Sequence, residues 1–261
     1  MSEVVVVEGK DIVERTYVAL KELKPNLPKG KFKVLIKPNL VEPMSNDSGA
    51  VTRKETVEGI VKFFEKKGCE IIIGEGASIL NTTECFEKAG YYELAEKYNV
   101  KIIDLNKTEF ISVKGKYWNF EISKLVEECY LISAAVLKEH PFEVTLALKN
   151  LMGILRPREN YPTKAYMHVE HDREKWAKRL CDLVRAAKPS LAVIDATTAM
   201  LNSHLFGKLK TLNLTLASED ILACDFVAAN LLGHKEVFYL NLALEEKIGN
   251  KPTKIKKIKL D

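Results

Sequence analysis

The residues best suited to chemistry lie in one stretch of the chain. Lys138 and His140 directly follow a strongly apolar run, and Lys149 comes nine residues after His140. If the fold brings these side chains together, like-charge repulsion would lower their pKa values. A partly neutral histidine or lysine can serve as an acid or base, and the remaining positive charge suits a carboxylate or phosphate. We therefore identify Lys138, His140 and Lys149 as candidate catalytic residues. The alternative is an exposed helix lysine at 149 and a capping or core histidine at 140.

A second cation stands in the same kind of position. Lys37 ends an apolar run, Pro38 forces an extended exit from it, and Asn39 offers an amide to a ligand or to the backbone. We expect Lys37 and Asn39 to bind the ligand together with Asn150 and Arg156. The alternative is an ordinary turn at 37–39.

Two aspartates are also candidates for the ligand site. Asp195 follows an apolar run, where catalytic carboxylates often lie, and Asp225 interrupts an apolar helical pattern. A buried carboxylate needs a partner. We expect both aspartates to belong to the site and to hold its lysines in place.

Metal binding has weaker support in the sequence. His168 and His171 are three residues apart near a predicted helix start, so they could share a face and bind a metal together with His140. A solvated histidine pair is the commoner arrangement. The cysteines are scattered and form no zinc or iron–sulfur motif, and the sequence names no cofactor; they are Cys69, Cys85, Cys129, Cys181 and Cys224.

Charge and composition narrow the classes of partner. The 261 residues include 40 basic and 36 acidic side chains, a net charge of +4, with lysines and glutamates interspersed as on thermophile proteins. This balance favours a small anionic molecule over nucleic acid. The N-terminus lacks a basic leader and the apolar runs are too short to span a membrane, so we expect a cytoplasmic protein without a membrane partner. A homo-oligomer is compatible with the sequence.

The pattern of elements predicts an α/β fold. Short β-branched runs alternate with longer amphipathic segments, which favours a mixed, mostly parallel sheet with helices on both faces, in a single domain over residues 1–261. Alternation on either side of Gly115 predicts an inserted β-hairpin over 110–122. Strands are expected at 4–7, 33–36, 70–73, 101–104, 130–137, 191–194, 211–216 and 254–259, and helices at 11–24, 52–67, 81–99 (broken near 90), 141–151, 172–187, 221–232 and 235–247.

Such a sheet also predicts where a ligand binds. Ligands of open α/β sheets collect beyond the carboxyl ends of the strands. This rule selects the polar residues that follow strands, namely Lys37, Asn39, Glu75, Lys138, His140 and Asp195. The sequence lacks three motifs that are common in α/β enzymes. They are the phosphate-binding P-loop, the dinucleotide-binding Gly-x-Gly-x-x-Gly and the hydrolase motif Gly-x-Ser-x-Gly.

Four blocks resemble the family called domain of unknown function 362. They are 34–41, 147–153, 193–195 and the pair 216–220 with 223–225, in that order over about residues 31–233. The resemblance implies a mixed α/β fold and a polar site built from these blocks, with no established reaction. Many relatives carry a ferredoxin-like module with clustered cysteines, which this chain lacks, so an iron–sulfur cluster is not expected. The family's Lys-Thr-His becomes Lys138-Glu139-His140, which adds a negative charge.

The nickel-pincer lactate racemases show a fainter similarity. Their cofactor-tethering lysine corresponds in position to Lys149, but the spacing and the neighbouring glycines differ. The similarity therefore indicates where a site lies and not that nickel is bound.

Two hypotheses about function follow. The first is an enzyme for a carboxylate or phosphate metabolite, in which His140 is the acid or base and lysines supply positive charge. The second is a non-catalytic protein that binds an anionic metabolite or cofactor, with metal binding compatible with either.

Overall fold

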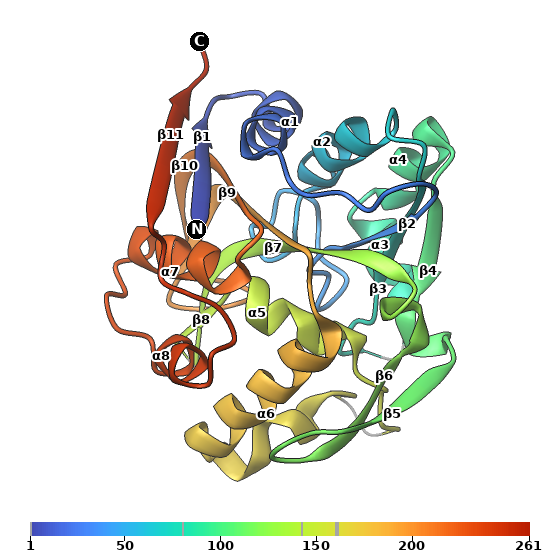
Figure 1. The fold of residues 1–261 in the computed structure, drawn as a ribbon, viewed down its shortest axis with the longest axis vertical. Coiled ribbons are helices and arrows are strands. Elements are labelled where there is room, and N and C mark those ends of the chain that lie inside the picture. The colour runs from blue at the N-terminus through green and yellow to red at the C-terminus, as the bar shows by residue number, and fades with distance from the viewer. Residues whose placement is uncertain (1, 80, 142, 160–161) are drawn as a thin grey trace.

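The computed structural model describes residues 2–79, 81–141, 143–159 and 162–261. Within them, nine strands form one sheet in the order β11–β1–β10–β9–β7–β2–β3–β4, with β8 beside the end of β7 (Figure 1). The strands are β1 (Glu3–Glu8), β2 (Lys33–Lys37), β3 (Glu70–Glu75), β4 (Lys101–Asp104), β7 (Cys129–His140), β8 (Glu143–Thr145), β9 (Leu191–Leu201), β10 (Lys208–Ser218) and β11 (Lys254–Lys259). Only β8 and β10 run against the others in this described sheet. The predicted mixed, mostly parallel sheet is confirmed.

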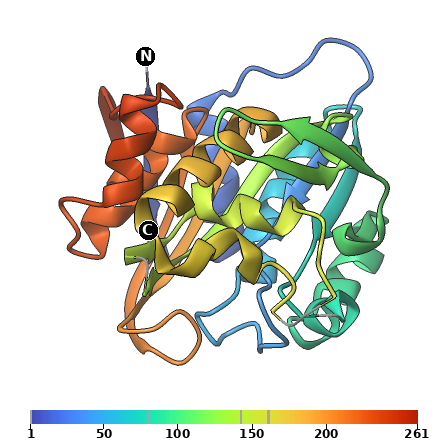
Figure 2. The ribbon, with the colours of Figure 1, turned by 90° about the horizontal axis from the view of Figure 1, so that it is seen from below.

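Helices cover both faces of the sheet, as predicted. They are α1 (Ile12–Leu23), α2 (Lys54–Phe64), α3 (Thr82–Lys88), α4 (Tyr91–Tyr98), α5 (Ala147–Asn150), α6 (Arg173–Ala187), α7 (Ile221–Leu231) and α8 (Phe238–Glu245), with 3-10 helices η1 (Leu105–Lys107), η2 (Lys124–Val126), η3 (Leu151–Ile154) and η4 (Ala165–His171). The strand order places α3 and α4 at one end of the sheet and the C-terminal elements at the other (Figures 1 and 2).

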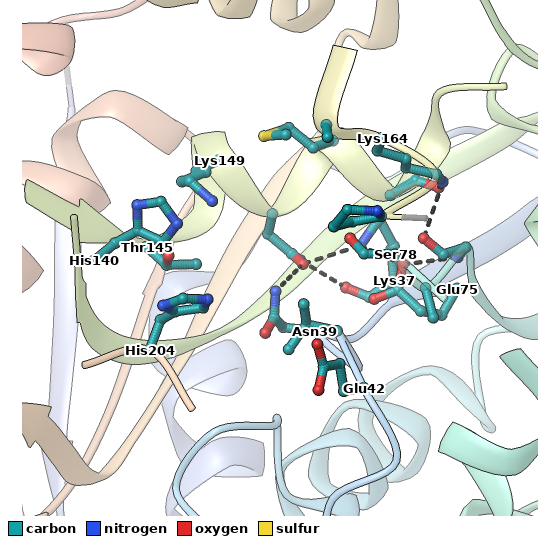
Figure 3. Close-up of a pocket in the computed structure, with 18 of the residues that line it drawn as sticks. Lys37, Asn39, Glu42, Glu75, Ser78, His140, Thr145, Lys149, Lys164 and His204 are labelled. Atoms are coloured by element: carbon teal, nitrogen blue, oxygen red, sulfur yellow. Dashed lines mark hydrogen bonds and ion pairs between the residues drawn. The ribbon is translucent and has the colours of Figure 1, made fainter. Parts of the chain in front are cut away.

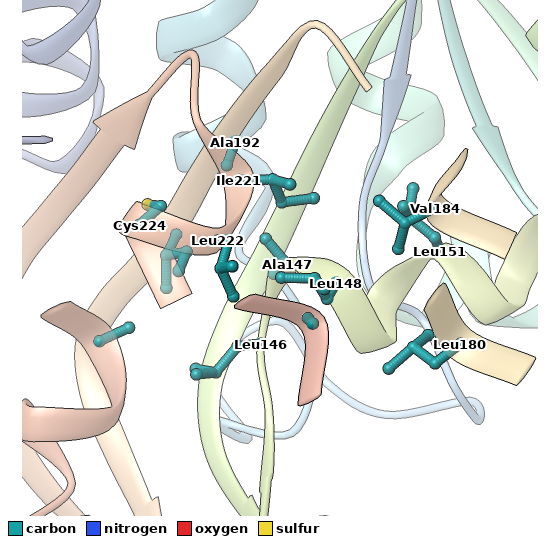
Figure 4. Packing of buried hydrophobic residues seen from close by; sticks show 14 of the residues in the cluster. Leu146, Ala147, Leu148, Leu151, Leu180, Val184, Ala192, Ile221, Leu222 and Cys224 are labelled. Atoms are coloured by element: carbon teal, nitrogen blue, oxygen red, sulfur yellow. The ribbon is translucent and has the colours of Figure 1, made fainter. Parts of the chain in front are cut away.

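Two apolar clusters hold these layers together. Successive strand residues point to opposite faces, so Val5 and Val7 pack with α1 and α2, while Val4 and Val6 belong to the cluster that includes α6, α7 and α8. In the second cluster, Leu148 on α5 lies between side chains of α6 and α7 (Figure 4). The short helix α5 is thereby fixed by packing on the sheet.

The predicted β-hairpin is present as a separate two-stranded sheet. Strands β5 (Phe110–Lys114) and β6 (Asn119–Ser123) pair antiparallel and join the nine-stranded sheet through no strand pairing among the described residues. An isolated bridge between Ile122 and Leu155 links the hairpin to the segment after η3.

One prediction at the candidate site is wrong. We expected a helix over 141–151, but β7 extends to His140 and the chain turns back as β8, which pairs antiparallel with Lys138–His140. The turn uses Glu143 in a left-handed conformation (φ 73°). Helical structure begins only at Ala147. Strands β9 and β10 are also much longer than expected and pair with each other.

None of the helices in the described ranges combines the length and the apolar character needed to cross a bilayer.

Candidate functional site

A cavity of about 180 Å³ lies beyond the carboxyl ends of β2, β3 and β7 (Figure 3). The residues that line it and enter the argument below are Lys37, Asn39, Glu42, Glu75, His140, Thr145, Lys149, Asn150, Gly153, Lys164, His168 and His204. This volume is smaller than the roughly 300–1,000 Å³ of sites for drug-sized ligands, so the cavity suits a small metabolite.

The structure brings together most of the residues that the sequence singled out. Lys37, His140 and Lys149 come from three separate segments and line the same cavity, as do Asn39 and Asn150. Lys37 and His140 meet because the parallel strands β2 and β7 end at one edge of the sheet, and helix α5 brings Lys149 and Asn150 to the same edge. Lys138 lies directly behind the cavity wall, and His168, a weak metal candidate, lies in the wall.

One end of the cavity holds a buried ion pair. The Nζ atom of Lys37 lies 2.8 Å from Oε1 of Glu75 and donates hydrogen bonds to Oδ1 of Asn150 (2.9 Å) and to the carbonyl of Pro38 (3.0 Å). The Lys37 and Glu75 side chains are 1% and 3% exposed. Glu75 also accepts hydrogen bonds from the backbone N–H groups of Leu40 and Gly76. Each of the two charges therefore has an opposite charge and further hydrogen bonds, although burial still lowers the pKa of Lys37.

A hydrogen-bond network fixes the cavity floor next to this pair. Lys138 donates to Oδ1 of Asn39 (2.9 Å) and to the carbonyl of Ala50 (2.6 Å), and Asn39 in turn donates to Oδ1 of Asn150 (3.1 Å). Asn150 donates to the Lys37 carbonyl (3.0 Å) and to the Ser133 hydroxyl (3.1 Å). Burial, reinforced by the charge of Lys149, lowers the pKa of Lys138 to about 7.

Two glycines allow the backbone to close over the ion pair. A Cβ atom on Gly153 would overlap the Glu75 carboxylate and the Lys37 side chain, and one on Gly76 would overlap the Gly153 carbonyl. Lys164 bridges both loops by donating to the carbonyls of Gly76 (2.9 Å) and Gly153 (2.5 Å). Burial lowers the pKa of Lys164 to about 7. The glycines are required here by close approach, because a side chain at Gly153 would displace the ion pair and one at Gly76 would displace Lys164 or the Gly153 carbonyl.

The other end of the cavity is not compensated. The ammonium of Lys149 has no hydrogen-bond or ion-pair partner among the described residues, and burial alone lowers the pKa of Lys149 to about 8. The Thr145 hydroxyl is buried in the same wall and likewise has no hydrogen-bond partner in the described part of the chain. Figure 3 shows Lys149, Thr145, His140 and His204 on one side of the cavity and Lys37, Glu75 and Lys164 on the other.

Histidines surround the uncompensated lysine. The ring of His140 lies 4.7 Å from the ring of His204 and 6.0 Å from that of His168, measured between centroids. Burial, followed by the charge of Lys149, lowers the pKa of His140 far below its ordinary value. Burial, followed by the charges of Lys138 and Lys149, lowers the pKa of His204 to about 4. Both imidazoles are therefore neutral near pH 7, and each can pass a proton on by accepting it at one ring nitrogen while the other ring nitrogen releases one.

The histidines whose side chains the structure describes do not form a metal centre. Among the side chains that the structure describes, no group of three or more His, Cys, Asp or Glu is placed to hold a metal ion. His171 falls in η4, but its side chain lies outside the described part.

Asp195 does not contact the lysines, contrary to expectation. Its carboxylate lies 3.9 Å from Arg15 and 3.6 Å from the Arg53 guanidinium, and it accepts a hydrogen bond from the Arg53 backbone N–H (3.0 Å). Because β9 turns this side chain toward α1 and the start of α2, Asp195 ties those helices to the sheet and does not line the cavity.

Asp225 also has partners other than lysine. It accepts hydrogen bonds from the backbone N–H groups of Ala147 (2.8 Å) and Leu148 (2.9 Å), the first residues of α5. Burial raises the pKa of Asp225 to about 8, against the lowering effect of these two bonds. Asp225 therefore positions the helix that carries Lys149 and Asn150 without touching the cavity.

Arg156 and Glu139 lie outside the cavity lining. Arg156 pairs with Glu121 at 2.9 Å, because the chain after η3 runs along the hairpin. Glu139 alternates with Lys138 and His140 along β7 and pairs with His234 at 2.8 Å, so the added negative charge does not face the cavity.

Sequence reasoning did not identify Lys164 and His204, and it selected Glu75 without its ion-pair partner. Lys164 and His204 lie in segments without periodicity, so no sequence signal marked them. Glu75 was noted only because it follows a strand, and its partner Lys37 lies 38 residues earlier by its number in the sequence.

Comparisons with known proteins agree with the location of this site. The family model described as "Domain of unknown function (DUF362)" matches residues 34–230, a range that contains every residue lining the cavity. The chain is also similar to thylakoid-associated protein sll1697 of Synechocystis sp. (strain ATCC 27184 / PCC 6803 / Kazusa). The two are 24% identical over 233 residues, which cover 87% of this chain and 71% of that protein.

Proposed function

The chain belongs to the DUF362 family, and we propose that its cavity binds a small carboxylate or phosphate metabolite and acts on it by acid–base chemistry. The observation that carries this proposal is the ammonium of Lys149. It lines the cavity with no counter-charge or hydrogen-bond acceptor in the described part of the chain, whereas Lys37 and Lys164 are each held by oxygen atoms. A desolvated charge without a partner is costly, and an anionic ligand would compensate it.

The overall charge of the cavity supports an anion. Three lysines and two glutamates line it, so its net charge is +1 when these five groups are ionised and the histidines are neutral. The glutamate nearest the lysines, Glu75, is already engaged by Lys37. The positive potential is therefore concentrated at Lys149, beside the unpartnered hydroxyl of Thr145.

The proposed roles follow from these contacts. Lys149 and Thr145 bind the anionic group, and His140 donates or accepts the proton. Asn39 and Asn150 keep the floor of the cavity rigid, with Lys138 behind them. Fixed polar groups of this kind hold the ligand in the orientation that the reaction needs, which can lower the activation barrier.

The anion site is tested by isothermal titration calorimetry with inorganic phosphate and with acetate. We expect the wild-type protein to bind at least one of them, and Lys149→Met to weaken that binding by at least about tenfold, which corresponds to about 1.4 kcal/mol. Lys66→Met, the same substitution at an exposed lysine, should leave affinity unchanged, and His140→Ala should retain binding. Equal affinity in the wild type and Lys149→Met, or no binding of either anion, would contradict the proposal.

We also propose that this protein is located in the cytoplasm. The five free cysteines support a reducing compartment. The relative from Synechocystis is named for an association with thylakoids.

A further inference from the structure

The four lysines at the site differ in whether protein oxygens accept hydrogen bonds from their amines. Lys37, Lys138 and Lys164 each donate at least two hydrogen bonds to protein oxygens, at distances of 2.5–3.0 Å. An amine held by acceptors in this way has its protons engaged and its position fixed. Lys149 alone has no such acceptor in the described chain, so its Nζ atom faces the cavity unconstrained.

The surroundings of Lys149 also favour its uncharged form. Burial lowers the pKa of Lys149 to about 8. At pH 7 an amine with this pKa is neutral in roughly one molecule in ten, against roughly one in three thousand for an ordinary lysine. Desolvation is one of the two known ways to make a lysine amine nucleophilic toward carbonyl groups.

We propose that Lys149 forms an imine with the carbonyl carbon of a small 2-oxo acid, which makes it the covalent centre of the cavity. This inference rests on the proposed anion site and adds the substrate class. A 2-oxo acid places a carboxylate next to the carbonyl carbon. The carboxylate pairs with the ammonium of Lys149 when the substrate binds and with the iminium nitrogen once the imine has formed, and the nitrogen is uncharged only during the attack and in the carbinolamine.

The step balances with water as its product. The neutral amine attacks the carbonyl carbon, a C–N bond forms, and the π electrons move to oxygen. One proton passes from nitrogen to that oxygen, with a neutral imidazole as relay, to give a carbinolamine. The oxygen then takes a second proton from solvent and leaves as water while the nitrogen lone pair forms the C=N bond. Amine, carbonyl compound and one proton thus become a protonated imine and water.

The histidine rings and the Thr145 hydroxyl next to Lys149 can assist these reaction steps. His140 and His204 are both neutral near pH 7, so either ring can relay a proton by accepting it at one nitrogen while the other nitrogen releases one. The Thr145 hydroxyl, which is 3% exposed and without a hydrogen-bond partner in the described part of the chain, can bond the carbinolamine oxygen or the carboxylate. No oxidant, reductant or metal is needed.

The test is reductive trapping with pyruvate. The full-length protein is incubated at pH 7 with pyruvate and sodium cyanoborohydride, and adducts are located by peptide mass spectrometry. We expect one saturable adduct at Lys149, formed at least about tenfold faster than at exposed lysines such as Lys66, slowed by inorganic phosphate and absent from Lys149→Met. Thr145→Val should slow trapping several-fold while leaving Lys149 in place.

The outcomes separate this inference from the anion site. If phosphate binds through Lys149 but pyruvate gives no adduct there, the imine is overturned and the anion site stands. If adducts form at Lys149 no faster than at Lys66, the imine is likewise overturned. If neither phosphate binding nor an adduct depends on Lys149, both proposals fall.

Discussion

Glu75→Gln is expected to lower the free energy of unfolding by about 3–5 kcal/mol, the usual cost of removing one partner of a buried ion pair. The substitution keeps the size of the side chain but removes the charge opposite Lys37, whose side chain is 1% exposed. Glu75 also offsets part of the burial cost of Lys164. Urea denaturation at pH 7 measures the effect.

An exposed pair provides the matched control. Glu70 lies 2.7 Å from Lys101, and their side chains are 41% and 69% exposed. Glu70→Gln should therefore cost less than about 1 kcal/mol. The double variant Lys37→Met/Glu75→Gln should recover much of the loss, because no unpaired buried charge remains. Strictly additive losses in the double variant, or equal costs at Glu75 and Glu70, would show that the pair at the cavity does not exist in solution.

Lys149→Met is expected to stabilise the protein by about 1–3 kcal/mol at pH 7. Replacing a core lysine that takes part in a salt bridge would instead destabilise the protein. The wild type must hold an ammonium in a largely desolvated position without a partner in the described chain, and methionine fills similar space without charge. Such a gain in stability at the expense of ligand binding is common at functional sites.

The pH dependence of this difference follows from the direction of the pKa shift. The pKa of Lys149 is lowered from 10.5 to about 8 on folding, so the unfolded chain binds more protons between these values. The stability of the wild type therefore rises relative to Lys149→Met as pH increases from about 8 to 10.5. The advantage of the variant should be largest below pH 8 and nearly absent by pH 10.5. Urea denaturation at both ends of this range measures it, with Lys66→Met as a control that stays within about 0.5 kcal/mol of the wild type. A variant less stable than the wild type at pH 7 would contradict an unpaired lysine.

The convergence of Lys37 and His140 could be predicted because it depends on a general rule. Apolar runs such as Val34–Ile36 are buried on both faces in parallel sheets, and the residues after such strands collect at one edge. Local patterns were therefore sufficient for the order of strands and helices over most of the chain and for the edge of the sheet where the cavity lies.

Contacts between distant segments explain what the sequence did not predict. The strand expected at 191–194 continues through Asp195 and Thr197, polar residues that look like a strand end but are buried against Arg15 of α1. The helix expected at 141–151 gives way to β8, because that segment pairs with the end of β7. Asp225 likewise has partners 77 and 78 residues away, which no local pattern reveals.

The most direct measurement of the central claim is an NMR titration of the Lys149 side chain in ¹³C-lysine-labelled protein, assigned with Lys149→Met. We expect the Lys149 resonance to titrate with a pKa near 8 in the free protein and at a clearly higher pH when saturating phosphate is present, because a bound anion favours the charged amine. A Lys149 that titrates near 10.5 and does not respond to phosphate or acetate would contradict an uncompensated cation at this cavity, and with it the proposed anion site.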